Sequence, residues 1–154
     1  MRFEKIKRET ERLFKVLSIA FVLAFAFAGN ANAGNKSEDD EFDWTPVVDA
    51  MIQVESRGNA NACHGQYAGV LQMSPAVVRA CNMILKKQGS IKRYTLRDRF
   101  SEKKSREMFA VFMSYYNPTN NVEKAIRMWN GGPGYSVKGT NRYYRTVMKY
   151  VDFD

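Results

Sequence analysis

The chain has 154 residues and carries 24 Lys and Arg against 16 Asp and Glu, which gives a formal net charge of +8. This basic character favours an anionic partner, but the sequence shows no aromatic and basic RNA-binding motif and no DNA-reading module. We therefore expect no nucleic-acid partner. The length allows one folded domain around a single core.

Residues 1–33 have the pattern of a secretory signal peptide. Residues 1–15 are net positive, residues 16–28 (VLSIAFVLAFAFA) are apolar, and Ala31 and Ala33 form a small-residue cleavage site. The apolar run is short for a bilayer-spanning helix, although an uncleaved membrane anchor is the alternative. We expect export to the periplasm or the extracellular space, which leaves a mature chain of about 120 residues.

The mature part divides into an acidic linker and a basic domain. Residues 34–154 hold 18 Lys and Arg and 13 Asp and Glu, a net charge of +5, and residues 37–43 (SEDDEFD) concentrate the acidic side chains. We assign residues 34–44 to the linker and residues 45–154 to the folded domain. In an exported protein, this basic domain favours anionic cell-wall polymer or a membrane surface.

The first predicted helix ends close to a glutamate. Thr45 and Pro46 form a helix start, and Gly58 is placed to stop the helix. The helical spacing puts Glu55 on the same stripe as the apolar residues Val48, Met51 and Ile52. The carboxyl group of Glu55 is therefore predicted to point towards the core side of its helix, where burial raises the pKa of a carboxylic acid.

Four further helices are predicted. They start at Ser74, Ser101, Asn121 and about Thr140. Cys81 lies on the apolar stripe of the first of these helices, and the Met and Phe stripe of the next one is assigned to the core. Residues 90–100 form a basic and aromatic connector. Because no segment alternates for long enough to predict a strand, we expect an all-α, mainly helical single domain.

The two cysteines of the chain, Cys63 and Cys81, fall in the exported part. An oxidising compartment and an even number favour a disulfide between them, which would close a loop of about 18 residues and contribute roughly 3 kcal/mol. A metal site from both cysteines and His64 is the alternative. One His and two Cys at this spacing match no common zinc pattern, so we predict no metal.

Three stretches at the ends of predicted helices are rich in Gly, Asn, Gln or Ser, which is unusual for segments with only a structural role. They are residues 55–62 (ESRGNANA), residues 68–75 (AGVLQMSP) and residues 127–136 (RMWNGGPGYS). Loops at helix ends can converge on one cleft, and binding residues concentrate in such loops. We expect these three stretches to form a site together.

At these residues the sequence resembles the soluble lytic transglycosylase family, whose domain is similar to goose-type lysozyme. The resemblance rests, in the family's order and spacing, on residues 55–56 (ES), 59–60 (NA), 69–72 (GVLQ), 128–134 (MWNGGPG) and the closing pair Thr140 and Tyr143. It implies a lysozyme-like single domain. The chain departs from the family where Trp129 replaces a Tyr, where Ala60 replaces a Pro, and at residues 63–64, where many members carry a Ser.

The resemblance implies cleavage of the MurNAc-GlcNAc β-1,4 bond of peptidoglycan by one essential glutamate. Glu55 would donate its proton to the leaving oxygen and then, as a base, take the proton of the 6-hydroxyl of the same MurNAc. The product would be 1,6-anhydroMurNAc. Such an acid needs a pKa raised from about 4.3 towards 6 or 7, which burial on an apolar stripe can supply. A hydrolytic muramidase and a catalytically silent glycan-binding module are the alternatives.

The remaining candidates are substrate-binding residues. They are Ser56, Gln72, Met73, Trp129, Asn130 and Tyr143. Several of them have a structural alternative: Ser56 can position the Glu55 carboxyl group or cap its helix, Met73 and Trp129 can line a sugar site or be core, and Tyr143 can donate a hydrogen bond to Glu55 or pack in the core. Asp98 can be a second catalytic acid or a cap residue. We expect no cofactor, peptidoglycan glycan strands as the partner and a monomer, while association with a cell-envelope machine stays open.

Overall fold

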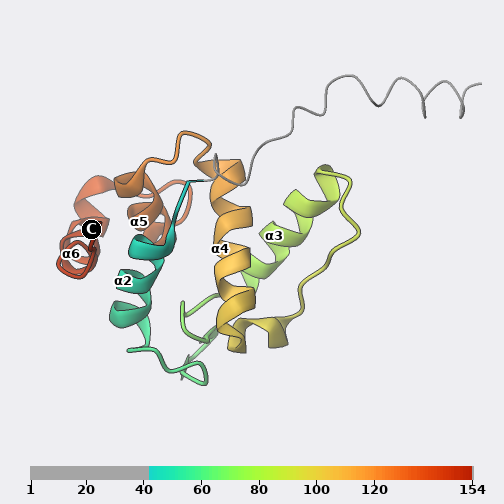
Figure 1. The fold of residues 1–154 in the computed structure, drawn as a ribbon, viewed down its shortest axis with the longest axis horizontal. Helices are drawn as coiled ribbons and strands as arrows, with labels where there is room; N and C mark the ends of the chain where they lie inside the picture. The colour runs from blue at the N-terminus through green and yellow to red at the C-terminus, as the bar shows by residue number, and fades with distance from the viewer. Residues whose placement is uncertain (1–41, 154) are drawn as a thin grey trace, which may run out of the picture. The chain divides into compact units, whose positions relative to one another are not determined.

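The computed structural model describes residues 42–153, so the predicted signal peptide and residues 34–41 of the predicted linker lie outside the described residues. Eight elements follow one another: α2 (Thr45–Glu55), β1 (Cys63–His64), β2 (Tyr67–Ala68), α3 (Pro75–Lys87), the 3₁₀ helix η2 (Leu96–Phe100), α4 (Glu102–Tyr116), α5 (Val122–Gly131) and α6 (Val137–Val147). Helices dominate this part of the chain (Figure 1). The all-α prediction is confirmed.

Side-chain caps explain where three helices begin. Ser74 accepts a hydrogen bond from the backbone of Val77, Ser101 from that of Lys104, and Asn121 from that of Lys124. These caps are those predicted for α3, α4 and α5, because each side-chain oxygen pairs with an otherwise unpartnered N–H of the first turn.

Two helix starts differ from the prediction. Helix α6 begins at Val137, ahead of the predicted start at about Thr140, because the Ser136 side chain accepts a hydrogen bond from the backbone N–H of Gly139 and caps the helix. Helix α2 begins at Thr45, but its N-cap is Trp44, and the Thr45 N–H donates instead to Oδ1 of Asp43 at 2.8 Å. The oxygen atoms that accept from the first turns of α6 and α2 therefore belong to Ser136 and Asp43, which lie just upstream of the predicted helix starts.

Helix α4 lies at the centre of the helical domain. Figure 1 shows it between α3 on one side and α2, α5 and α6 on the other. Met108, Phe109 and Met113 on α4 are fully buried, which confirms the predicted core stripe. The rings of Trp44 and Trp129 pack against Phe109 with centroid distances of 5.5 and 5.2 Å. Burial of each such side chain contributes about 1.5–3 kcal/mol, so this layer fixes α4 and α5 together.

A short hairpin between α2 and α3 was not predicted. In it, Cys63 pairs with Ala68 and His64 pairs with Tyr67 in an antiparallel register, and Gly65 has a φ of +59° in the turn. Strands of two residues are too short to show the alternation that predicts a strand. After the hairpin, Ala68 and Met73 form an isolated antiparallel β-bridge, which joins the hairpin to the segment before α3.

The disulfide prediction is wrong. Cys63 is an exposed residue of the hairpin, whereas Cys81 is fully buried on α3, and both thiols are free. The Cys81 thiol donates to the carbonyl oxygen of Met108 at 3.3 Å, and burial raises its pKa to about 12. Cys81 faces the α3–α4 contact because it belongs to the apolar stripe of α3. Because this stripe faces the core, the Cys81 thiol does not reach Cys63 on the surface.

Within residues 42–153, the helices are too short or too polar for any of them to cross a lipid bilayer.

Candidate active site

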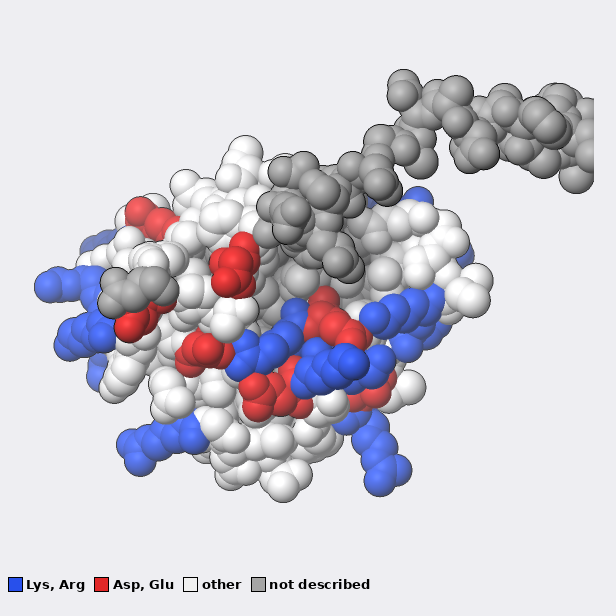
Figure 2. All heavy atoms as spheres, in the orientation of Figure 1, with Lys and Arg blue, Asp and Glu red and all other residues white. Residues whose placement is uncertain are grey.

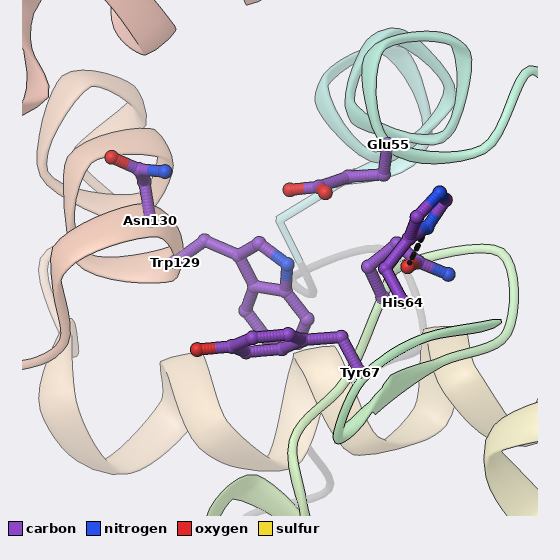
Figure 3. Close-up of a pocket in the computed structure, with 6 residues that line it drawn as sticks. Glu55, His64, Tyr67, Trp129 and Asn130 are labelled. Atoms are coloured by element: carbon purple, nitrogen blue, oxygen red, sulfur yellow. Dashed lines mark hydrogen bonds between the residues drawn. The ribbon is translucent and has the colours of Figure 1, made fainter.

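The three polar stretches meet at one open cavity, as predicted. The cavity has a volume of about 400 Å³ and is lined by Glu55, His64, Tyr67, Gln72, Trp129 and Asn130 (Figure 3). Glu55 comes from the end of α2, three residues come from the hairpin and the loop after it, and two come from α5. Among the described residues that line the cavity, Glu55 is the only carboxylic acid.

Glu55 is the last residue of α2, and its carboxyl group points into the cavity (Figure 3). The side chain is half-buried and follows the fully buried Met51 on the same helix. Burial raises the pKa of Glu55 above its usual value of 4.5, because an ionised carboxylate loses hydration there. This shift is in the direction needed by an acid that holds its proton until a substrate arrives.

Tyr143 on α6 is the hydrogen-bond partner of Glu55. Its hydroxyl donates to Oε1 of Glu55 at 2.6 Å. The bond favours the ionised acid and so lowers the Glu55 pKa, but this effect is smaller than that of burial. Burial, followed by the negative charge of Glu55, raises the pKa of Tyr143 well above its usual value, so the phenol stays protonated and keeps donating. Tyr143 therefore orients one oxygen of Glu55 and leaves the other for the cavity.

Ser56 does not line the cavity. Its hydroxyl donates to the carbonyl oxygen of Val70 at 2.9 Å, and its backbone N–H closes the last turn of α2 on Ile52. The side chain therefore joins the end of α2 to the loop that carries Gln72. Of the two roles offered for Ser56, the structure shows the one at the helix end, where its hydroxyl also lies 3.4 Å from the carbonyl oxygen of Ile52.

Gln72 lies in the cavity wall with its amide already bonded inside the protein. Nε2 donates to the carbonyl oxygens of Ala62 at 3.1 Å and Gly69 at 2.8 Å, and Oε1 lies 2.9 Å from Nδ1 of His64. The residue has a φ of +44°, a left-handed conformation that few non-glycine residues adopt. Both amide hydrogens are therefore used to hold the loop in shape.

Only glycine fits at position 69, because of its backbone conformation and its close contact with a neighbouring segment. Its φ is +80°, and a Cβ at this position would collide with the carbonyl oxygen of Arg99 on η2. The Arg99 guanidinium in turn donates to the carbonyl oxygens of Gln66 at 2.8 Å and Met73 at 2.9 Å. The 3₁₀ helix thus supports the hairpin and the Gln72 loop from behind.

Trp129 and Asn130 form the α5 side of the cavity (Figure 3). The indole N–H of Trp129 donates to the carbonyl oxygen of Leu71 at 3.1 Å, while its ring packs on Phe109 and Phe112. The ring is half-buried, so Trp129 belongs to the core and also presents an edge to the cavity. Asn130 is exposed and offers both an amide donor and an acceptor.

A second cavity of about 310 Å³ adjoins the first. The two share Tyr67, Trp129 and Asn130, and the second continues over apolar residues of α3 and α4, among them Val77 and Phe112. A ligand longer than one sugar ring can therefore extend along this face.

Two further candidates, Met73 and Asp98, do not line the cavity. Met73 is 1% exposed, and its backbone pairs with Ala68, so the structure places it in the core. Asp98 accepts hydrogen bonds from the backbone N–H and the hydroxyl of Thr95 and forms the capping box of η2. It has the cap role that the sequence offered as its alternative.

His64 and Tyr67 line the cavity, but the sequence did not single them out as binding residues. They pair with each other in the hairpin. The sequence points to His64 only as a possible metal ligand and as part of a departure from the family at residues 63–64. A local signal is present: a histidine and a tyrosine flank a Gly-Gln pair, residues 64–67 (HGQY), which is a turn sequence between two of the predicted site stretches.

The described residues hold no group of three or more His, Cys, Asp or Glu side chains placed to bind a metal ion. The alternative site from Cys63, His64 and Cys81 is not formed, since Cys81 is buried away from the hairpin.

Comparison with known proteins found no matching family model, no matching curated sequence and no matching solved structure.

Proposed function

We propose that this chain is an exported lytic transglycosylase that cleaves the MurNAc-GlcNAc β-1,4 bond of peptidoglycan. The observation that carries the proposal is Glu55: a half-buried acid with a raised pKa, held by Tyr143, at the wall of an open cavity. The motif resemblance and the geometry of the cavity single out the same glutamate. A general acid needs both a raised pKa and access to the substrate; the raised pKa of Glu55 and its place in the cavity wall support this role.

The reaction uses Glu55 twice. The protonated acid gives its proton to the glycosidic oxygen as the bond from that oxygen to C1 of MurNAc breaks, which releases the GlcNAc hydroxyl. The resulting carboxylate then takes the proton of the C6 hydroxyl of the same MurNAc as that oxygen bonds to C1. No water is consumed, the acid regains its proton, and the product is 1,6-anhydroMurNAc.

The cavity wall suits a glycan. Tyr67 and Trp129 offer aromatic surface for the apolar face of a sugar ring, and Asn130 offers an amide for an N-acetyl group or a hydroxyl. The adjoining second cavity gives room for neighbouring sugars of a strand. The basic net charge attracts the domain to an anionic wall, and Figure 2 shows Lys and Arg side chains projecting around the margin of one face.

The single acid favours the anhydro route over hydrolysis. Most glycosidases place a second carboxylate across the bond, to activate water or to act as the nucleophile. Among the described residues that line the cavity, none besides Glu55 can do this, and Asp98 is committed to Thr95. Hydrolysis by a muramidase and simple glycan binding are then distinguishable outcomes of one experiment.

The experiment is a digest of purified peptidoglycan by the purified exported chain, followed by mass spectrometry of the released glycan. We expect products that end in 1,6-anhydroMurNAc, and we expect none from the Glu55→Gln variant. Gln keeps the size of the side chain and can still accept the Tyr143 hydrogen bond, so loss of activity reports the lost proton. Reducing ends would identify a muramidase instead, and equal release by both proteins would contradict catalysis by Glu55.

A further inference from the structure

The cavity holds one group that the reaction described above does not use. His64, the single histidine of the chain, is an exposed residue of the hairpin, and its ring lines the cavity together with Glu55. Figure 3 shows the hydrogen bond between one ring nitrogen and the neighbouring amide. That amide is Gln72, whose Oε1 lies 2.9 Å from Nδ1 of His64.

The hydrogen bonds of Gln72 determine which ring nitrogen carries the hydrogen. Its Nε2 faces two backbone carbonyl oxygens, those of Ala62 and Gly69, and both can only accept. A flipped amide would set an oxygen against these two oxygens, so the orientation is fixed. Oε1 therefore faces His64, and because that oxygen has no hydrogen, Nδ1 must donate. In the neutral imidazole, Nε2 is then a bare acceptor.

We propose that Nε2 of His64 accepts a hydrogen bond from a hydroxyl or N–H of the bound glycan, with Gln72 as the positioning residue that fixes the tautomer. This inference rests on the proposed function, because it names the ligand by the same site. It also moves direct recognition from Gln72, whose amide hydrogens are used inside the loop, to the histidine that it holds.

The fixed tautomer makes the site selective. An acceptor without a hydrogen favours a sugar hydroxyl or an amide N–H and disfavours a carbonyl or carboxylate oxygen at the same place. Tyr67 and Asn130, on other parts of the wall, can each donate as well as accept. His64 therefore differs from Tyr67 and Asn130, because it discriminates between a donor and an acceptor on the ligand.

Nitrogen NMR tests the proposal directly, because a single histidine gives a single pair of ring ¹⁵N signals. In the chain labelled with ¹⁵N-histidine, we expect the Nδ1–H tautomer with Nε2 unprotonated. Adding an alternating GlcNAc-MurNAc tetrasaccharide to the inactive Glu55→Gln variant should shift the Nε2 signal and leave Nδ1 almost unchanged. An Nε2–H tautomer, or an Nε2 signal that does not move when the tetrasaccharide is bound, would overturn the proposal.

Two substitutions separate ligand binding from structural support. In His64→Asn, the amide nitrogen takes the place of Nδ1 and keeps the bond to Gln72, but nothing takes the place of Nε2. We expect this variant to raise the KM for glycan cleavage about fivefold with kcat nearly unchanged, the effect of one lost hydrogen bond. His64→Ala should raise KM at least as much. Gln66→Ala, an exposed neighbour that does not line the cavity, is the matched control.

The outcomes distinguish this inference from the proposed function. If His64→Asn keeps the wild-type KM while His64→Ala raises it, the histidine only supports Gln72 and the inference is wrong. The proposed cleavage of peptidoglycan is not affected by that result. If the wild-type chain cleaves no peptidoglycan and binds no tetrasaccharide, the proposed function fails, and the inference fails with it. A raised KM together with the shift of the Nε2 signal supports both.

Discussion

Two glutamates of this domain each accept a hydrogen bond from a tyrosine, yet their pKa values shift in opposite directions. Tyr143 donates to Glu55 at 2.6 Å, and Tyr94 donates to Glu107 at 3.3 Å. Burial dominates at Glu55 and raises its pKa, whereas the hydrogen bond from Lys92 dominates at Glu107 and lowers its pKa. Because both glutamates accept a hydrogen bond from a tyrosine, this bond does not decide the direction of the pKa shift.

The cations make the difference. Lys92 lies 2.7 Å and Lys104 lies 3.6 Å from Oε2 of Glu107, and Figure 2 shows basic and acidic side chains interleaved over the first half of α4. Among the described residues, no salt bridge reaches Glu55. A glutamate beside cations is held ionised and is suited to the surface, while one in a half-buried wall without them is suited to proton transfer.

The largest expected effect comes from removing each acid in turn. Glu55→Gln should lower the rate of glycan release by about 10²–10⁴-fold, the usual contribution of a general acid or base. Glu107→Gln should leave the rate within about twofold, since surface substitutions away from a site have small effects. Release of soluble muropeptides measures both. Equal losses in the two variants would mean that the two glutamates do not differ as described.

The next largest effect concerns the loop that builds the cavity wall. Gly69→Ala should destabilise the domain by at least about 2 kcal/mol, because its Cβ collides with Arg99 and its φ is positive. Gly58→Ala, where φ is +81° but nothing lies within 4 Å, should cost only about 1 kcal/mol. Urea unfolding measures both. Similar values for the two would contradict the close approach of η2 to the loop.

Of the two tyrosine substitutions, only Tyr143→Phe should move the pH profile of kcat/KM. Tyr143→Phe deletes a hydrogen bond that favours ionised Glu55, so the Glu55 pKa should rise further. The acid would then stay protonated to a higher pH, and the alkaline limb of the kcat/KM profile should move upward. A limb that moves down, or that moves equally in Tyr94→Phe, would show that Tyr143 does not act on the catalytic proton.

The smallest effect is on thermal stability, with opposite signs. The stabilisation from a raised pKa, as at Glu55, is present below 4.5 and is lost as pH rises through the folded value. Glu55→Gln should therefore raise Tm at neutral pH by a few degrees and have no effect near pH 4.

For Glu107 the lowered pKa reverses the argument. Its stabilisation is present above 4.5 and is lost as pH falls through the lowered value, so Glu107→Gln should reduce Tm slightly at neutral pH. Because the pair is partly exposed, we expect less than about 1 kcal/mol, and high salt should remove the difference. Calorimetry at pH 4 and 7 tests both variants, and shifts of the same sign would contradict the comparison.

The sequence predicted the parts of this fold that depend on local chemistry. The caps at Ser74, Ser101 and Asn121 and the inward stripe that ends in Glu55 were predicted because each depends on a few neighbouring residues. Even the hydrogen bond from Tyr143 to Glu55 was one of the two roles that the sequence offered for this tyrosine.

The sequence failed where long-range geometry decides. The His64–Tyr67 hairpin has no periodicity to detect, and the amide of Gln72 is used up by carbonyl groups that only the folded loop brings to it. The disulfide error was avoidable, because Cys81 on the apolar stripe of α3 already indicated burial.

A ¹³C NMR titration of the glutamate carboxyl groups tests the central claim most directly, with signals assigned from the Glu55→Gln and Glu107→Gln variants. We predict a titration midpoint above 4.5 for Glu55 and below 4.5 for Glu107 in the same sample. A Glu55 midpoint at or below that of Glu107 would contradict the account, because the acid would then be ionised before any glycan arrived.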